Sequence, residues 1–295
     1  MTVRIGLSEK NVKYAFLIPC MIVLACLAIF PTIYSLYLTF CSWELSGAVQ
    51  LWPVFNGGQN WVRLVQDTRF WSDLGTTLVF AAGAVSIEFI VGLGMAMLLN
   101  RQIPGRGILR VIFLIPMMAT PVVVGYTFRM LFNMEHGPVN YFLSLIGAPA
   151  LNWLGDSAVA LPAMILADAW EWTPFMILVL LAGLQAIPQE PYEAALVDGA
   201  GPWQVFRYVT FPMLTPVMTV AVILRLVETL KIFDILYVVT AGGPGISTES
   251  LSLYVQIVGL TQMSLGYGSN VAYGLLVLVI IVATIFLNRM RRQKL

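Results

Sequence analysis

The length of its uncharged stretches restricts this chain more than any other feature. Residues 14–43 contain no charged side chain, and a helix needs roughly 20 mainly apolar residues to cross the hydrocarbon core of a bilayer. Of all residues, 59% are hydrophobic and only 11% are charged, whereas about 25% are charged in a typical soluble domain. The sequence therefore predicts an all-α, polytopic membrane protein rather than a soluble domain.

Apolar segments long enough to span a membrane recur six times. The first is too long for a cleavable signal peptide, so we expect it to be retained as a helix. Pro116 and Pro121 interrupt the third, which a membrane helix tolerates when its neighbours satisfy the freed backbone groups. We predict one transmembrane domain over residues 1–295, with spans at 14–40, 73–99, 111–132, 158–187, 213–240 and 267–288.

The distribution of Lys and Arg predicts the orientation of the spans. Cytoplasmic loops carry an excess of these residues. Most of those outside the spans lie in the two terminal segments, in the loop 100–110 and in the loop 188–212, whereas the alternate loops and their edges hold Arg63, Arg69 and Arg129. We therefore expect a multi-pass protein of the inner membrane, with both termini and the loop 188–212 on the cytoplasmic side. The net charge of +1 gives no reason to expect a nucleic-acid partner.

Residue types that form catalytic or metal sites are scarce. His136 is the only histidine, and Cys20, Cys26 and Cys41 lack the spacing of a metal or disulfide framework. The phosphate-binding pattern Gly-x4-Gly-Lys-Ser/Thr does not occur. We predict no catalytic residue, no metal site and no cofactor, and any ATP hydrolysis would have to come from another polypeptide.

A mostly polar segment separates the fourth span from the fifth. The Ala-rich run beginning at Glu193 favours a short helix, for which Pro191 is suited to the first position. Gly199 can adopt the left-handed conformation that ends a helix, and Pro202 can open a second one. The sequence predicts a helix, a turn and a second helix outside the membrane.

The spacing of this segment resembles the EAA loop in the membrane subunits of binding-protein-dependent ABC importers. The matching positions are Glu193, Ala194, Ala195, Gly199, Val209, Phe211 and Pro212, with Val209 and Phe211 standing where Ile and Leu are usual. In that family the loop docks in a cleft of the cytoplasmic ATPase. The resemblance therefore implies that coupling to an ATPase falls on Glu193, Ala194, Ala195, Asp198, Gly199 and Pro202.

Nearly the whole chain resembles the carbohydrate branch of these permeases, which includes the larger maltose permease subunit and the glycerol-phosphate permeases. Besides the loop, the matching runs are residues 59–64, 152–154, 184–188, 233–234 and 240–244. The resemblance implies the type I ABC importer permease fold. It also implies the partners of the subunit: a second, homologous permease subunit, two copies of an ATPase subunit, an extracytoplasmic solute-binding protein, a carbohydrate-like solute and membrane lipid.

Polar and aromatic side chains share one face of the fourth span at the spacing i, i+3, i+4, i+7, and the fifth span repeats the pattern. The eight residues are Asp168, Glu171, Trp172, Phe175, Arg225, Glu228, Thr229 and Ile232. Carboxylates and Arg can hydrogen-bond sugar hydroxyls while a ring covers the apolar face of a sugar. These positions also align with the residues that line the sugar site of the maltose permease subunit, so the resemblance implies that they line the solute pathway.

Structural explanations for these ionisable groups remain open. Asp168 or Glu228 could pair with Arg225 simply to hold two helices together. Lys231 and Asp234 have the i, i+3 spacing of a local ion pair.

Two other classes of function have less support. An ion-coupled secondary transporter would use Glu88 and the other carboxylates of the spans as a relay, but the two halves show no evident inverted repeat. An intramembrane enzyme would need a nucleophile with a base, or a metal cluster. The identity of the solute and the roles of Glu88 and Arg129 do not follow from the sequence.

Overall fold

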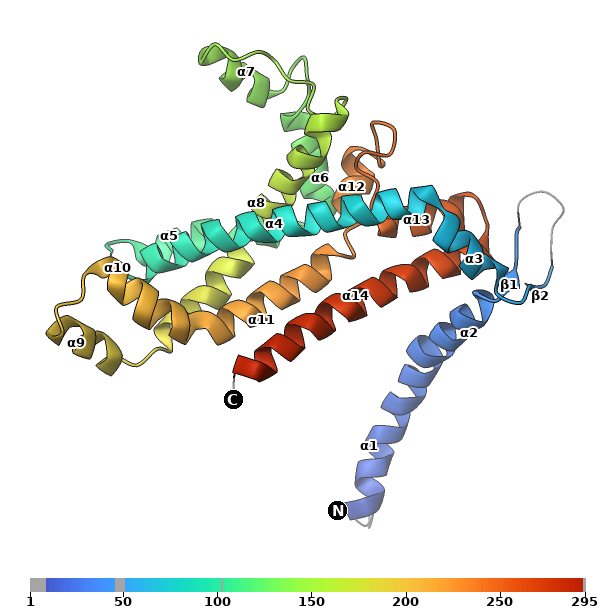
Figure 1. The fold of residues 1–295 in the computed structure, drawn as a ribbon, viewed down its shortest axis with the longest axis horizontal. Helices are drawn as coiled ribbons and strands as arrows, with labels where there is room; N and C mark the ends of the chain where they lie inside the picture. The colour runs from blue at the N-terminus through green and yellow to red at the C-terminus, as the bar shows by residue number, and fades with distance from the viewer. Residues whose placement is uncertain (1–8, 46–50, 102, 294–295) are drawn as a thin grey trace, which may run out of the picture. The chain divides into compact units, whose positions relative to one another are not determined.

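The computed structural model describes residues 9–45, 51–101 and 103–293. Within these ranges the regular structure is helical, apart from the short antiparallel pair β1 (Cys41–Ser42) and β2 (Val54–Phe55) (Figure 1). The predicted all-α class is thus confirmed. Contacts divide the chain into two compact units, Met1–Asp67 with Val255–Tyr273 and Thr68–Tyr254 with Gly274–Leu295.

Five helices of the described ranges are long and apolar enough to cross a membrane. They are Lys13–Leu38, Thr68–Asn100, Ser157–Gln185, Pro202–Thr229 and Leu265–Asn288. They correspond to the first, second, fourth, fifth and sixth predicted spans, with ends that differ by several residues in places. The third predicted span is made of shorter helices.

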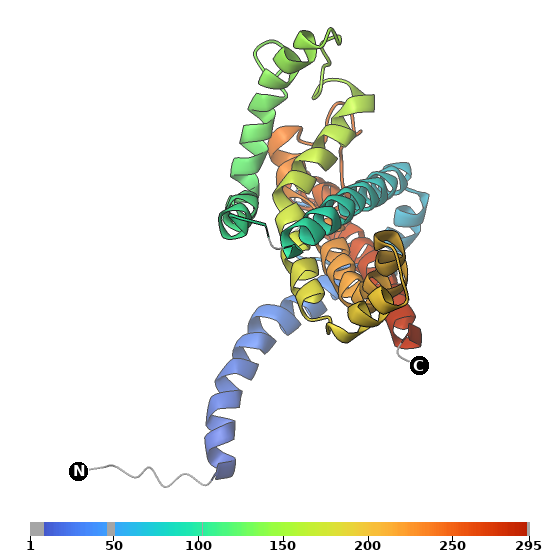
Figure 2. The same ribbon diagram turned by 90° about the vertical axis from the view of Figure 1, so that its left-hand side faces the viewer.

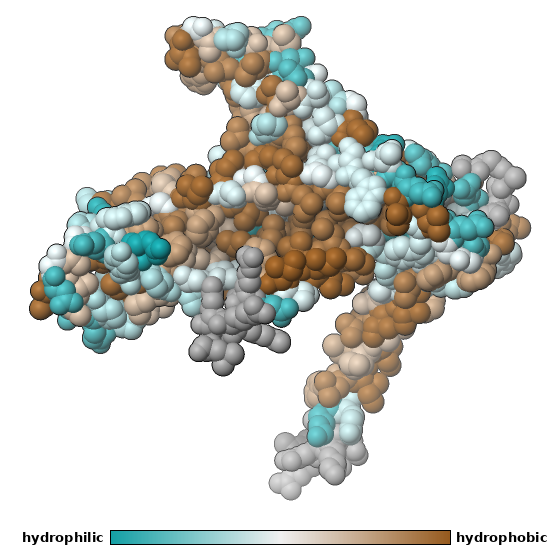
Figure 3. Space-filling model, in the orientation of Figure 1, coloured by the Kyte–Doolittle hydropathy of each residue, from teal (hydrophilic) through white to brown (hydrophobic). Residues whose placement is uncertain are grey.

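The first unit begins with one continuous helical run. It consists of α1 (Glu9–Leu24), the π-helix η1 (Ala25–Ile29) and α2 (Phe30–Leu38). Its apolar side chains are exposed, for example Phe16 at 79% and Leu27 at 76%, and Figure 3 shows the apolar surface along α1 and α2. Such a surface is suited to lipid tails or to another apolar helix.

The remainder of the first unit packs around the β1–β2 pair. The helix α3 (Gln59–Gln66) places the amide of Asn60 where it donates to the carbonyl oxygen of Cys41 at 2.8 Å. The π-helix η4 (Ile257–Thr261) precedes α14 (Leu265–Gln293). Arg63 lies over the ring of Tyr267 at 4.1 Å, so a cation–π contact joins α3 to the start of α14.

In the second unit, α4 (Thr68–Asn100) packs against α8 (Ser157–Gln185), and the ribbon views show the two helices crossing (Figures 1 and 2). Small residues permit the close approach: a Cβ added at Gly92 would lie 2.6 Å from the Cβ of Met176. Ala84, Ala163 and Ala167 are fully buried. Small side chains of this kind are typical where membrane helices meet. The helix α11 (Phe211–Thr229) also packs against both α4 and α8.

The predicted interruption of the third span by proline is confirmed. The segment forms α5 (Arg106–Leu114), the 3-10 turn η2 (Pro116–Met118) and α6 (Pro121–Leu131). Ala119 and Thr120 have extended backbones between them. For Thr120 this is expected, because the residue before a proline avoids the helical conformation. Beyond α6, the helix α7 (Pro138–Leu145) leads back to α8.

The prediction that the fifth span continues as one helix to Thr240 is wrong. The helix α11 ends at Thr229, and α12 (Asp234–Val239) starts after a short break. A tertiary contact satisfies a backbone group that the break exposes, since the hydroxyl of Ser250 donates to the carbonyl oxygen of Ile232 at 2.8 Å. Residues 230–233 contain neither Gly nor Pro, so the local sequence does not predict the break.

The turn predicted at residues 242–244 is present between α12 and α13 (Leu251–Gln256). Gly242 and Gly245 have positive φ angles of 90° and 61°. Arg69 donates from Nε and Nη2 to the two carboxylate oxygens of Glu249 at 2.7 and 2.8 Å. This bidentate pair joins the start of α4 to the loop before α13, with geometry that favours strong charge-assisted bonds.

Candidate functional site

A buried cluster of charged side chains joins three helices of the second unit. Arg225 on α11 donates from Nε to Oε2 and from Nη2 to Oε1 of Glu88 on α4, both at 2.7 Å. The same Nη2 donates to Oδ2 of Asp168 on α8 at 2.6 Å. The three residues are exposed by 3% or less. Because a buried charge is tolerated only when it is paired and hydrogen-bonded, each member depends on the others.

Trp172 covers the cluster on one side. The centre of the Arg225 guanidinium lies 4.7 Å from the centroid of the Trp172 ring, within the range of a cation–π interaction. Arg225 is therefore held by two carboxylates and an aromatic ring. Thr229 lies one turn further along α11, where its hydroxyl donates to the carbonyl oxygen of Arg225 at 2.6 Å.

The contacts decide between the ion pairs that the sequence leaves open. Asp168 pairs with Arg225, which is one of the two pairings considered. Glu228 does not: its carboxylate accepts a hydrogen bond from Lys231 Nζ at 3.0 Å. The predicted pairing of Lys231 with Asp234 is therefore wrong, because the end of α11 places Lys231 beside Glu228 on the preceding turn, whereas Asp234 begins the next helix.

Glu88 is the member of the cluster whose role sequence reasoning misses. The signal was an acidic residue near the centre of a long apolar run, which marks an ionisable group in need of a partner. The partner cannot be read from spacing, since 137 positions separate Glu88 from Arg225. The other residue without a predicted role, Arg129, donates from Nη1 to the carbonyl oxygen of Val238 at 3.3 Å.

A pocket of about 150 Å³ opens beside the cluster. Six of the eight predicted pathway residues line it: Asp168, Glu171, Trp172, Arg225, Glu228 and Ile232. Pro121 of α6 and residues 231 and 233–235 complete the lining. Phe175 and Thr229 are not part of the lining, and Thr229 is fully buried. The pocket is thus lined by polar groups and an aromatic ring, and it lies at the break between α11 and α12.

Two carboxylate groups that line the pocket have oxygens without a hydrogen-bond partner in the described part of the chain, although that of Asp168 is enclosed by protein. Among the described residues, Oδ1 of Asp168 is buried without a hydrogen-bond partner. Glu171 is only 3% exposed and lines the pocket, and within the same residues it makes no hydrogen bond or ion pair. Buried acceptors of this kind are costly unless a partner satisfies them. The Glu171 carboxylate can therefore accept hydrogen bonds from a molecule in the pocket, and Nη1 of Arg225, which makes no hydrogen bond among the described residues, can donate them.

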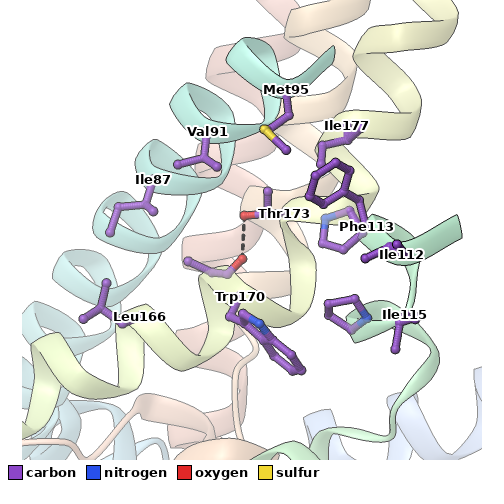
Figure 4. Close-up of a pocket in the computed structure, with 13 residues that line it drawn as sticks. Ile87, Val91, Met95, Ile112, Phe113, Ile115, Leu166, Trp170, Thr173 and Ile177 are labelled. Carbon is purple, nitrogen blue, oxygen red and sulfur yellow. Dashed lines mark hydrogen bonds between the residues drawn. The ribbon is translucent and has the colours of Figure 1, made fainter. Parts of the chain in front are cut away.

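A second, larger pocket differs sharply in chemistry. It has a volume of about 650 Å³ and lies among α4, α5, η2 and α8 (Figure 4). Its lining is apolar except for Thr173 and the indole nitrogen of Trp170. The hydroxyl of Thr173 donates to the carbonyl oxygen of Ala169 at 2.6 Å, the contact drawn as a dashed line. This pocket offers few groups to a hydroxyl-rich solute.

The segment between α8 and α11 has the predicted helix, turn and helix. The first helix, α9 (Glu190–Val197), begins at Glu190, so Pro191 occupies its second position rather than the first. Gly199 has a φ of +74°, and the amide of Ala200 donates to the carbonyl oxygen of Ala195 at 2.9 Å. This is the left-handed helix end that glycine favours.

The second short helix is continuous with the fifth span. It consists of α10 (Pro202–Val205), followed directly by the π-helix η3 (Phe206–Thr210) and then by α11, so that one helical run covers Pro202–Thr229. The hydroxyl of Tyr192 donates to that of Thr210 at 3.2 Å. Several apolar side chains of the segment are exposed, including Val197 at 88% and Trp203 at 71%. An exposed apolar surface on an otherwise polar segment is typical of a protein interface.

The fold is that of the membrane subunit of an ABC importer. A chain of the crystal structure titled as a bacterial ABC transporter involved in the import of the acidic polysaccharide alginate matches with a TM-score of 0.82 over 95% of both chains, at 23% identity. Residues 88–295 match the family described as the binding-protein-dependent transport system inner membrane component. The chain belongs to this family, and it is a translocation subunit rather than an enzyme.

Relatives of similar length extend the likeness to nearly the whole chain. A trehalose/maltose transport system permease protein (MalF) of Thermococcus litoralis is 37% identical over 99% of both chains. A sulfoquinovosyl glycerol transport system permease protein (SmoG) of Agrobacterium fabrum is 33% identical over 98% of this chain and 93% of its own. A trehalose transport system permease protein (SugA) of Mycobacterium tuberculosis is 30% identical over 96% of this chain and 89% of its own. The resemblance to sugar permeases that the sequence suggests is thus confirmed.

Proposed function

We propose that this chain forms part of the pore through which a carbohydrate or related solute, such as a sugar, a polyol or a sugar derivative, enters the cell. An extracytoplasmic binding protein delivers the solute, a second homologous permease completes the pore, and two copies of an ATPase supply the energy. Membership of the family supports the transport role. The names of relatives that carry trehalose, maltose and sulfoquinovosyl glycerol support the class of solute.

The observation that carries the proposal is the polar pocket beside Arg225. Asp168, Glu171 and Arg225 line it together with the ring of Trp172, which is the combination that a sugar needs for its hydroxyls and its apolar face. Its volume of about 150 Å³ is below the roughly 300 Å³ at which pockets for drug-sized ligands begin. We therefore expect it to contact one sugar ring, or less, at a time.

Coupling to the ATPase is assigned to Glu193, Ala194, Ala195, Asp198, Gly199 and Pro202. The exposed apolar side chains around these residues support a docking role. The helical run Pro202–Thr229 connects the segment directly to Arg225. A displacement of α10 by the ATPase would therefore move the arginine that holds α4 and α8 together, without any flexible linker in between.

The orientation remains part of the proposal, with both termini and the coupling segment on the cytoplasmic side and residues 1–295 forming one transmembrane domain. The excess of Lys and Arg in those segments supports it. Single cysteines introduced at Lys13 and at Asp198, in a variant without the native cysteines, should react with a membrane-impermeant maleimide only after the cytoplasmic face is opened. Labelling in intact cells would indicate the opposite orientation.

Reconstituted transport tests the function as a whole. The complex of this chain with its partner permease and ATPase, in proteoliposomes supplied with the binding protein, should accumulate radiolabelled sugar only with ATP. Uptake should stop with orthovanadate and continue with an uncoupler of ion gradients. Uptake that needs an ion gradient and no ATP would instead support an ion-coupled transporter and overturn the proposal.

A further inference from the structure

We infer that the apolar pocket among α4, α5, η2 and α8 binds an acyl chain of an anionic phospholipid, and that Arg106 and Arg110 on α5 bind the phosphate of the same lipid. No residue lines both this pocket and the pocket beside Arg225. The inference therefore goes beyond the proposed transport function and does not depend on the identity of the solute.

The pocket has the chemistry and the length that a hydrocarbon chain needs. Its volume is about 650 Å³, and its only polar side chains are those of Thr173 and Trp170. In Figure 4, Ile87 on α4 lies across the pocket from Ile115 on α5. The lining extends along α4 from Ile87 to Met95, which is about 12 Å at the rise of an α-helix. A long apolar cavity between membrane helices is suited to a lipid tail.

The pocket opens at the surface of the unit rather than in a closed core. Its lining includes side chains that are about half exposed, among them Ile112 at 51%, Leu166 at 48% and Trp170 at 47%. The helices α4 and α8 on its walls are each long and apolar enough to cross a membrane. A lipid tail can therefore enter from the bilayer without separating these helices.

α5 carries positive charge at one end of the pocket. Arg106, Arg110 and Phe113 follow each other at spacings of four and three residues, so they share one face of α5. Phe113 lines the pocket, and Arg110 lies about 4.5 Å from it along the helix axis. The two arginines are thus placed for the head group of a lipid whose tail occupies the pocket, since basic sites between membrane helices bind anionic head groups.

These arginines lack a counter-ion among the described residues. Nε of Arg110 is buried without a hydrogen-bond partner there, and neither guanidinium makes an ion pair within the same ranges. Residues 89–134 contain no Asp or Glu. Like charges four residues apart on a helix repel each other, and a buried donor without a partner is costly. A lipid phosphate would relieve both through charge-assisted hydrogen bonds.

Photolabelling of the assembled permease–ATPase complex tests the inference. The complex is placed in phosphatidylcholine nanodiscs with a trace of phosphatidylglycerol that carries a diazirine in one acyl chain, and labelled residues are mapped by mass spectrometry. Residues 87–95, 112–116 and 166–177 should be labelled. Photoreactive phosphatidylcholine with the same chains should label them roughly tenfold less, because each basic residue beside an anionic lipid favours binding by about fivefold.

A charge variant tests the head-group site. In the double variant Arg106→Gln with Arg110→Gln, labelling by the two lipids should agree within about twofold, since both charges that distinguish the lipids are removed. The matched control is Arg207→Gln, which removes one positive charge at an exposed position of η3 outside the pocket. It should leave the preference for phosphatidylglycerol unchanged.

A size variant tests the tail site separately. Val91→Trp fills the pocket with a larger side chain and leaves the arginines in place, so labelling of residues 112–116 and 166–177 should be lost. Val79→Trp makes the same change on the same helix at a position that is 57% exposed and does not line the pocket. Labelling should persist in this control.

The outcomes are distinct. Equal labelling by the two lipids, or a preference for phosphatidylglycerol that survives the double arginine variant, would overturn the assignment of the phosphate to α5. Labelling of the pocket that survives Val91→Trp would overturn the assignment of the tail. If neither lipid labelled the pocket while other exposed residues of the chain were labelled, another subunit would cover it, and the inference as a whole would be wrong.

Discussion

Oε1 of Glu88 on α4 lies 2.7 Å from Nη2 of Arg225 on α11, and the second oxygen of the same carboxylate lies 2.7 Å from Nε. The geometry is the bidentate form in which Arg recognises a carboxylate most strongly. Asp168 joins from α8, so one guanidinium connects all three helices.

Glu88→Gln is expected to destabilise the complex. The substitution keeps an acceptor but leaves buried Arg225 with one anionic partner, and breaking a buried pair costs about 3–5 kcal/mol when a partner is removed outright. The measurement is thermal unfolding of the purified complex in detergent. Glu228→Gln is the matched comparison, because Glu228 and Lys231 form an exposed pair of the kind that contributes about 0–1 kcal/mol. Equal effects of the two variants would contradict the structural role of Glu88.

Gly92→Val should disturb the same cluster from a distance. A Cβ at Gly92 would meet the Cβ of Met176 at 2.6 Å, so α4 has to move away from α8. Glu88 lies one turn earlier on the same face of α4, and its contact with Arg225 would be strained. We expect a loss of about 1–3 kcal/mol in the unfolding experiment, together with reduced transport.

Gly94→Val provides the control for this packing effect. Gly94 lies on the same helix, yet a Cβ added there meets nothing within 4 Å. The two variants make the same chemical change at neighbouring positions, so any general effect of valine on α4 is shared. A stability loss of similar size at both positions would show that close packing against Met176 is not the cause.

The parts of the structure that the sequence predicts are those with local causes. The long apolar runs predict α4 and α8, because a membrane helix needs little more than length and hydropathy. The turn at Gly199 follows from the freedom of glycine at positive φ. The interruption before α6 follows from Pro116 and Pro121, which act on their own backbone.

The parts that could not be predicted have causes distant in sequence. Where α11 ends, the hydroxyl of Ser250 donates a hydrogen bond to the freed carbonyl oxygen of Ile232. No residue near Thr229 predicts that the helix ends there. The bidentate partner of Arg225 is likewise supplied by another helix. Helical spacing could place Arg225 and Asp168 on polar faces, but only the packing of α4 shows that Glu88 completes the site.

Glu171→Ala should lower sugar uptake at least tenfold while the ATPase activity measured without solute is unchanged. Glu171 lines the pocket and makes no hydrogen bond to the described residues, so its loss removes a contact for the solute and no contact of the fold. Thr229→Val should change uptake less than threefold, because the Thr229 hydroxyl is directed to the backbone of Arg225. The measurement is ATP-driven uptake by proteoliposomes, and the reverse order of effects would place the pathway on the Thr229 side.

Gly199→Val tests the coupling segment. Valine is strained at a φ of +74°, by roughly 1–2 kcal/mol for the left-handed conformation, although a Cβ there would meet nothing within 4 Å. We therefore expect the turn between α9 and α10 to change shape while the spans stay folded. Expression and assembly should be preserved, and sugar uptake and solute-stimulated ATP hydrolysis should fall at least tenfold.

Gly147→Val supplies a control with the same backbone strain. Gly147 follows α7, has a φ of +72°, and also has open space where a Cβ would be placed. Both variants thus introduce the same side chain at the same backbone conformation, and only Gly199 lies in the segment assigned to the ATPase. If Gly147→Val reduced uptake as much as Gly199→Val, general strain would explain the loss; if Gly199→Val transported sugar normally, the assignment of this turn to coupling would be wrong.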